Sequence, residues 1–94
     1  MQKMNESQIN KNLEALHGWS FSSGYLTKTF QFSDFKETFA AMTHIAFECE
    51  LQGHHPNWEN VYNSLTIRLN THDADGITEK DFKLAKSIDV ITKS

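Results

Sequence analysis

Residues 65–70 read LTIRLN, and this short stretch decides the fold class. Its apolar side chains, Leu65, Ile67 and Leu69, alternate with three polar ones. This is the period-2 pattern of a strand that has one face in a core and the other in water. Strands of this kind are typical of an antiparallel sheet that is covered on one side only. We therefore expect a sheet with one polar face.

The segments before LTIRLN supply the rest of the sheet. Trp19–Ser22 and Tyr25–Phe32 flank a Ser23-Gly24 turn and read as a hairpin. Asn60–Asn63 is expected as a short strand, after a loop from His54 to Glu59. Along the longer hairpin strand, one face would carry Leu26, Lys28, Phe30 and Phe32.

Helical periodicity and capping residues predict three helices. They cover residues 6–16, residues 34–52 and the region after Thr78. Asn5 with Gln8, and Thr78 with Asp81, have the spacing of a capping box, and Ser33 or Asp34 is expected to cap the middle helix. Gly18 and Gly53 are expected to end the first two helices. The expected apolar faces of the first and last helices are Ile9, Leu13 and Leu16, and Phe82, Ala85, Ile88 and Ile91.

The long helix has more apolar residues than one face can hold. One stripe consists of Phe32, Phe35, Phe39, Met42, Ala46 and Cys49. A second stripe consists of Ala40, Phe47 and Leu51. We expect one stripe to cover the sheet and the other to be available to another subunit. The element order is then αββαββα, an α+β fold in which a four-stranded antiparallel sheet carries three helices on one face. The 94 residues form a single domain, 1–94.

The composition excludes several classes of partner. The formal net charge is −3, the pI is about 5.9, and lysine or arginine runs are absent from the sequence. This argues against a nucleic-acid groove and against an anionic membrane surface. Cys49 is the only cysteine, and no run of 18 apolar residues or signal-like start is present. We expect a cytoplasmic protein.

The side chains suited to chemistry gather between Glu50 and Asp81. His54 and His55 follow the expected end of the long helix, on a loop stiffened by Pro56. Their imidazoles should point in different directions, because a residue before proline favours extended backbone. Imidazole can donate or accept a proton near neutral pH, which suits it to general acid–base catalysis.

Two carboxylates could orient these rings. Glu50 lies four residues before His54 and could hydrogen-bond a ring nitrogen, which would fix its tautomer. Asp81 could do the same for another histidine, or it could hold a substrate N–H group. Trp58 offers a flat apolar surface to a flat heterocycle. His72 lies on the polar side of its strand if the strand extends that far.

Each of these residues also has a purely structural interpretation. A surface histidine is often only solvated, Asp81 could serve only the helix N-terminus, and Trp58 could belong to the core. Three histidines and a carboxylate could also ligate Zn²⁺. The histidine spacing fits no common zinc pattern, so we expect no metal.

Residues 48–67, ECELQGHHPNWENVYNSLTI, and residues 69–81, LNTHDADGITEKD, closely resemble the pterin-4a-carbinolamine dehydratase family. The similarity continues more weakly through Gly18-Trp19, the Phe-rich hairpin and residues 85–89. The resemblance implies the αββαββα fold found above. It also implies a homodimer or homotetramer, with the long helix and a sheet edge as contacts and the Phe35/Phe39/Met42 stretch as one contact region.

The activity implied by the resemblance is the dehydration of 4a-hydroxytetrahydrobiopterin, or a related tetrahydropterin, to a quinonoid dihydropterin. This lyase reaction recycles the pterin of aromatic amino-acid hydroxylases, without a metal or organic cofactor. The implied catalytic set is His54, His55 and His72. His54 and His72 would be the acid and base in an order left open, and His55 would bind and orient the pterin. Supporting roles fall to Glu50, Asp81, Pro56 and Trp58, the last two as pocket wall.

A second interpretation belongs to a different class of function. Some animal members of the family also act as a dimerisation partner of a homeodomain transcription factor. The chain could accordingly be a pterin-binding or coactivator protein with little catalytic duty. The complete set of His54, His55 and His72 favours the enzyme.

Overall fold

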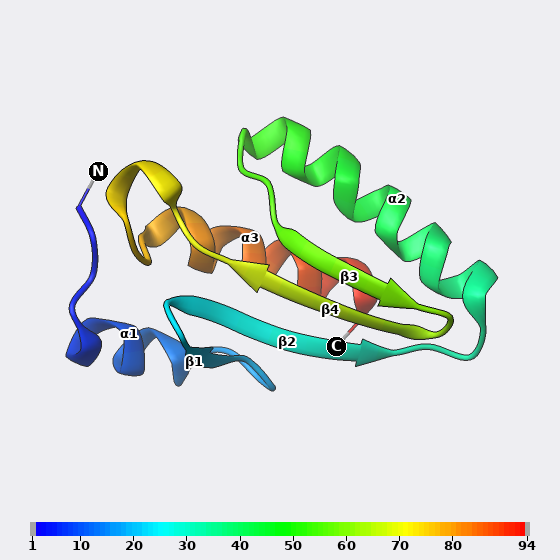
Figure 1. Cartoon of the computed structure of the whole chain (residues 1–94), viewed down its shortest axis with the longest axis horizontal. Coiled ribbons are helices and arrows are strands. Elements are labelled where there is room, and N and C mark those ends of the chain that lie inside the picture. The colour runs from blue at the N-terminus through cyan, green and yellow to red at the C-terminus, as the bar shows by residue number, and fades with distance from the viewer. Residues whose placement is uncertain (1, 94) are drawn as a thin grey trace.

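In the computed structural model, which describes residues 2–93, three helices pack on one antiparallel sheet (Figure 1). The elements are α1 (Glu6–Leu13), β1 (Ser20–Ser22), β2 (Tyr25–Gln31), α2 (Phe35–Gln52), β3 (Asn57–Val61), β4 (Ser64–Leu69), a 3₁₀ turn η1 (His72–Ala74) and α3 (Glu79–Thr92). The strand order is β1-β2-β4-β3, so LTIRLN lies mostly in a central strand. The expected order αββαββα and the α+β class are confirmed.

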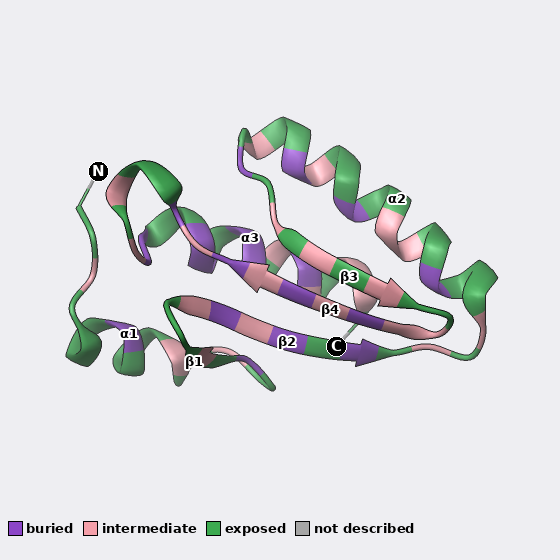
Figure 2. Ribbon diagram, viewed as in Figure 1, coloured by how far each residue is buried: buried purple, intermediate pink, exposed green. Residues whose placement is uncertain are grey.

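The register of the sheet places the buried apolar residues of the strands on one face. Leu26 lies opposite Leu69, and Phe30 lies opposite Leu65. These four side chains are at most 5% exposed, and they pack with residues from all three helices. Figure 2 shows the resulting alternation of buried and less buried residues along β2 and β4. The other face is polar, as expected from LTIRLN, and includes a hydrogen bond of 2.9 Å between the hydroxyls of Thr29 and Thr66.

The two hairpins differ in how well the sequence predicted them. Ser23 (φ 53°) and Gly24 (φ 85°) both adopt positive φ, as a type I′ turn requires. The expected strand Asn60–Asn63 is wrong, because β3 spans Asn57–Val61 and the chain reverses at Tyr62, whose φ is 52°. The Asn60 side chain donates to the carbonyl oxygens of Tyr62 and Ser64, which stabilises this turn.

The face of α2 that covers the sheet matches the first expected stripe only at Met42 and Cys49. Its buried residues are Thr38, Ile45 and Cys49, with Met42 half-buried between them. Phe35, Phe39, Phe47 and Leu51 are 46%, 55%, 68% and 81% exposed. The expectation failed because apolar residues surround most of this helix, and spacing alone cannot choose among several apolar faces.

Local capping chemistry sets the helix boundaries. Asn5 and Thr78 both form the expected capping boxes, and Asp34 rather than Ser33 caps α2. α1 ends at Leu13 instead of Leu16, because its last turn tightens into i→i+3 hydrogen bonds that end at Ala15 and Leu16.

A buried ion pair joins β2 to α3. Lys28 Nζ lies 2.9 Å from Asp89 Oδ1 and donates to the His17 carbonyl oxygen at 2.8 Å. Trp19 Nε1 also donates to Asp89, at 3.0 Å. The Lys28 and Asp89 side chains are 8% and 14% exposed. This cluster explains why a lysine can occupy the apolar face of β2.

The helices of residues 2–93 include none that combines the length and apolar character required to cross a bilayer.

Candidate functional site

His54 is anchored by the end of α2. Gly53 ends this helix in the left-handed conformation (φ 63°), which glycine adopts without strain. The backbone N–H of His54 then donates back to the carbonyl oxygen of Cys49 at 3.1 Å. This geometry turns the chain inward, so that His54 is only 9% exposed.

Asp81 holds the imidazole of His54 from the start of α3. His54 Nε2 and Asp81 Oδ1 are 2.6 Å apart, and Asp81 is fully buried. The other carboxylate oxygen, Oδ2, accepts from the Thr71 hydroxyl at 2.8 Å and from the Thr78 backbone N–H at 2.9 Å. An ionised carboxylate can only accept hydrogen bonds, so the ring nitrogen that faces it must be the donor. We therefore assign the proton of His54 to Nε2. The lone pair of the neutral ring then lies on Nδ1.

His72 is linked to this hydrogen-bond network by the residue before it in the chain, Thr71. Thr71, whose hydroxyl binds Asp81, is paired with Gly76 by a backbone hydrogen bond of 2.8 Å across the loop. His72 follows directly, at the start of η1, and is exposed. β4 ends at Leu69, so His72 lies beyond the strand and outside the core. The Asp81 network therefore brings the His54 loop and the His72 turn together.

His55 turns the opposite way from His54, as the neighbouring proline predicted. Its Nε2 lies 2.6 Å from Glu50 Oε2, and the two side chains are 61% and 76% exposed. Glu50 thus orients His55, while Asp81 takes His54. The two adjacent imidazoles have different partners and different environments, which suits them to different tasks.

Pro56 and Trp58 lie at the side of this arrangement. Pro56 is half-buried and its peptide bond is trans. Trp58 is part of β3, opposite Ile67, and packs against the hydrophobic core. The residues that line the cavity beside His54 include neither of them. Trp58 therefore has a packing role, and a contact of either residue with a ligand stays a prediction.

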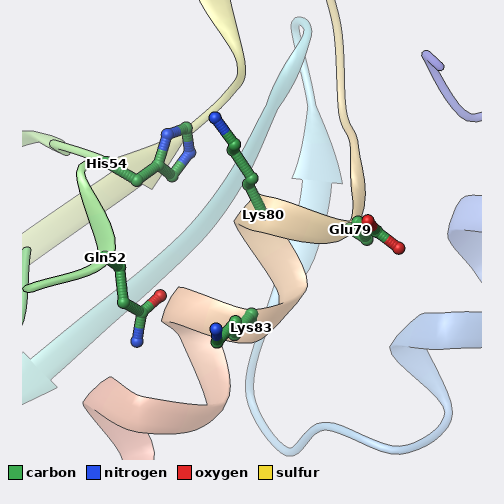
Figure 3. Close-up of a pocket in the computed structure, with 5 residues that line it drawn as sticks. All are labelled: Gln52, His54, Glu79, Lys80 and Lys83. Carbon is green, nitrogen blue, oxygen red and sulfur yellow. The ribbon is translucent and has the colours of Figure 1, made fainter. Parts of the chain in front are cut away.

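A cavity of about 370 Å³ opens beside His54 (Figure 3). Its lining residues are Gln52, His54, Glu79, Lys80 and Lys83. The Gln52 amide is fixed by donating to Glu48 at 2.9 Å and to Ser87 of α3 at 2.8 Å. The volume lies in the range of small-molecule sites.

Sequence reasoning overlooked several residues around His54. Thr71 was not singled out, and Thr78 was expected only as a helix cap, although the capping box already placed Thr78 beside Asp81. Lys80 and Lys83 were overlooked, because their spacing indicates no site until α3 is packed beside the end of α2. Among residues 2–93, no cluster of three or more His, Cys, Asp or Glu side chains could hold a metal ion.

Burial affects one further group near the end of α2. The thiol of Cys49 is 2% exposed, and burial, with the adjacent Glu48 and Glu50 carboxylates, raises its pKa from 9.0 to about 11. A thiol with this pKa is protonated at neutral pH and is therefore a poor nucleophile. Cys49 accordingly belongs to the core rather than to the chemistry of the site.

Comparisons with known proteins identify a family to which this chain is similar. The family model described as pterin 4 alpha carbinolamine dehydratase matches residues 2–91. A protein of Christiangramia forsetii, named "Putative pterin-4-alpha-carbinolamine dehydratase", is 53% identical over 94 residues, which cover 100% of this chain and 97% of that protein. A Rhizobium meliloti protein of the same name is 46% identical over 90 residues, covering 94% of this chain and 86% of that protein.

Two solved structures share the fold. The crystal structure of a transcriptional coactivator/pterin dehydratase from Brucella melitensis has a TM-score of 0.93 and 37% identity, covering 96% of this chain and 98% of that one. A pterin dehydratase-like protein identified as a RuBisCO assembly factor in the alpha-carboxysome has a TM-score of 0.71 and 24% identity, covering 84% and 94%. The second likeness concerns the fold alone.

Proposed function

The chain belongs to the pterin 4 alpha carbinolamine dehydratase family, and from this premise we propose that it removes water from a 4a-hydroxytetrahydropterin to form a quinonoid dihydropterin. The C4a–O bond breaks, the hydroxyl leaves as water after gaining a proton, and N5 loses its proton as the C4a=N5 bond forms. No electrons are exchanged with another molecule. The reaction therefore needs one proton donor and one proton acceptor.

The hydrogen bond between His54 and Asp81 is the observation that carries this proposal. It gives His54 one free nitrogen, Nδ1, and a carboxylate partner stabilises the positive charge that appears on the ring when Nδ1 takes up a proton. We therefore assign His54 as the base that accepts the N5 proton. His72, exposed on the adjacent turn, is then the acid that protonates the leaving hydroxyl. General acid–base catalysis of this kind is worth roughly 10²–10⁴-fold in rate.

The other predicted site residues are proposed to bind and position the pterin. His55, oriented by Glu50 at 2.6 Å, is proposed to bind and orient the ring system from the exposed side. Pro56 holds the two histidines on divergent paths. Contacts of Pro56 and Trp58 with the pterin remain predictions. So do the absence of a cofactor and the cytoplasmic location. The same holds for biopterin as the physiological pterin and for its recycling for aromatic amino-acid hydroxylases.

A second copy of the chain is the proposed partner of the exposed face of α2. Phe35 and Phe39 lie with ring centroids 5.7 Å apart and are both about half exposed. Large exposed apolar side chains on one helix are typical of a protein–protein contact. We propose a homodimer or homotetramer that uses this face, with no direct nucleic-acid contact.

The Brucella relative's description as a transcriptional coactivator, together with the exposed α2 face, supports one alternative. The chain could bind pterin or a partner protein on the same fold with little catalytic duty. This alternative predicts a well-folded protein that binds dihydropterin without turnover.

The test is a dehydratase assay. A hydroxylase generates the 4a-hydroxytetrahydropterin, and the decay of its absorbance is followed with and without this protein. Catalysis should exceed the uncatalysed decay and should fall by one or more orders of magnitude in His54→Ala and in His72→Ala, by roughly the factor expected for a lost acid or base. His44→Ala removes an exposed histidine of α2 away from the site and serves as the matched control. Near-wild-type rates in both site variants would refute the mechanism.

A further inference from the structure

One wall of the cavity beside His54 carries two positive charges. Lys80 and Lys83 are three residues apart on α3, so they are neighbours on one helix face. Figure 3 shows Lys80 extending beside the His54 ring and Lys83 lying one turn further along, near Gln52. Within residues 2–93, neither lysine forms a salt bridge with a carboxylate.

The acidic lining residue does not neutralise this wall. The Glu79 side chain points away from His54 in Figure 3. The chain as a whole has a net charge of −3, so the pair of lysines is a local feature against an acidic background. Two ammonium groups beside a cavity attract an anionic group of a ligand.

The group that varies among pterins, the side chain on C6, lies close to the reacting atoms of the ring. The reacting carbon C4a and the carbon that bears the side chain, C6, are both bonded to N5, whose proton His54 is proposed to accept. The C6 side chain therefore leaves the ring within one side-chain length of His54. A chain of a few atoms directed towards α3 would bring its far end to the lysines.

We propose that Lys80 and Lys83 form an anion subsite that selects pterins whose C6 side chain ends in a phosphate or carboxylate over pterins with an uncharged side chain. This inference rests on the proposed function, because it takes the cavity at His54 as the pterin site. It specifies the substrate class, which family membership leaves open. The two lysines determine specificity and take no part in the proton transfers.

Both lysines are exposed, so their contribution should be moderate and sensitive to salt. We expect each to tighten binding of an anionic side chain by about threefold at low ionic strength, as for an exposed ion pair, so that the two together give about tenfold. Half-molar salt should remove most of the preference, because it screens exposed charges within a few ångströms.

The experiment compares dihydropterins that differ only at the end of the C6 side chain. Dissociation constants are measured by fluorescence titration for 7,8-dihydroneopterin, for its 3′-monophosphate, and for a 7,8-dihydropterin with a carboxylate-terminated side chain. The proteins are the wild type, the double variant Lys80→Gln/Lys83→Gln, and Lys86→Gln. The last is the matched control, since it makes the same change on α3 but does not line the cavity.

We expect wild type and Lys86→Gln to prefer at least one anionic dihydropterin by about tenfold, and the double variant to bind all three within about twofold. Preference for the phosphate alone, or for the carboxylate alone, would identify which anion the subsite accepts. Equal affinity for charged and uncharged dihydropterins in the wild type would overturn the inference. So would a preference that survives in the double variant, or one that Lys86→Gln reduces equally. Failure of every dihydropterin to bind, with no turnover, would instead remove the proposed function.

Discussion

Replacing Asp81 by asparagine should invert the tautomer of His54 while leaving the shape of the site intact. Asp81 accepts three hydrogen bonds, at 2.6 Å from His54, 2.8 Å from Thr71 and 2.9 Å from the Thr78 N–H. Asparagine has a single oxygen. If that oxygen takes the place of Oδ2 and keeps the two threonine contacts, the amide NH₂ faces His54, and Nε2 must become an acceptor.

The consequences can be estimated for rate and for stability. With Nε2 as acceptor, the neutral ring carries its proton on Nδ1, and His54 can no longer act as the base. Turnover should then fall by roughly 10²–10⁴-fold. Three hydrogen bonds to a charged group become bonds to a neutral one, which we expect to lower the free energy of unfolding by about 2–3 kcal/mol. For a domain of this size, that corresponds to a fall in Tm of roughly 10–20 °C.

The assay must separate the lost base from the lost stability. Turnover of Asp81→Asn is measured well below its Tm, with the folded fraction taken from circular dichroism and the His54 tautomer from ¹⁵N chemical shifts. Asp89→Asn is the matched control, because it makes the same change in a largely buried carboxylate, which binds Lys28 and Trp19 away from the cavity. It should lose stability but retain turnover. Folded Asp81→Asn with turnover within about threefold of the wild type, or with the Nε2–H tautomer retained, would refute the assignment of His54 as base.

Four further predictions concern the rest of the molecule. Lys28→Met should lower the free energy of unfolding in urea by about 2–4 kcal/mol, because it leaves the largely buried Asp89 without its cation; a change below about 1 kcal/mol would mean that the pair is dispensable. Cys49 should react with a thiol reagent at pH 8 only after unfolding, since its pKa of about 11 and its burial keep it protonated and covered, and rapid labelling of the native protein would contradict this. The same raised pKa stabilises the folded state fully below pH 9.0 and less as the pH rises towards about 11, which a series of Tm measurements can check. Phe39→Glu should lower the molecular mass in light scattering if a second copy covers α2, and an unchanged mass at the same concentration would argue against that contact.

The sequence predicted the fold through local signals. The alternation of LTIRLN, the Ser23-Gly24 turn and the capping boxes at Asn5 and Thr78 act within a few residues, and all of them are present in the structure. Choices that depend on packing were predicted less well. The buried face of α2 includes Thr38 and Ile45, which the spacing of apolar residues did not single out.

The candidate site shows the same division. The divergence of His54 and His55 follows from Pro56 and is present in the structure, and the carboxylates that could orient them were identified. The pairing of Asp81 with His54, and of Glu50 with His55, depends on where α3 lies relative to the end of α2. The position of Lys80 and Lys83 at the cavity depends on the same packing of α3, and so does the ion pair of Lys28 with Asp89. Neither could therefore be predicted from the spacing of residues in the sequence.

The position of Asp81 has a consequence for interpreting related sequences. The same carboxylate closes the capping box that begins α3 and fixes the ring of His54. A relative that had abandoned catalysis would still need this aspartate to start its last helix, and selection for folding alone would retain it. Its presence in a homologue is therefore no sign of activity. The imidazole of His72 is exposed and takes no part in this capping box, so its loss or retention says more about whether a relative still performs the reaction.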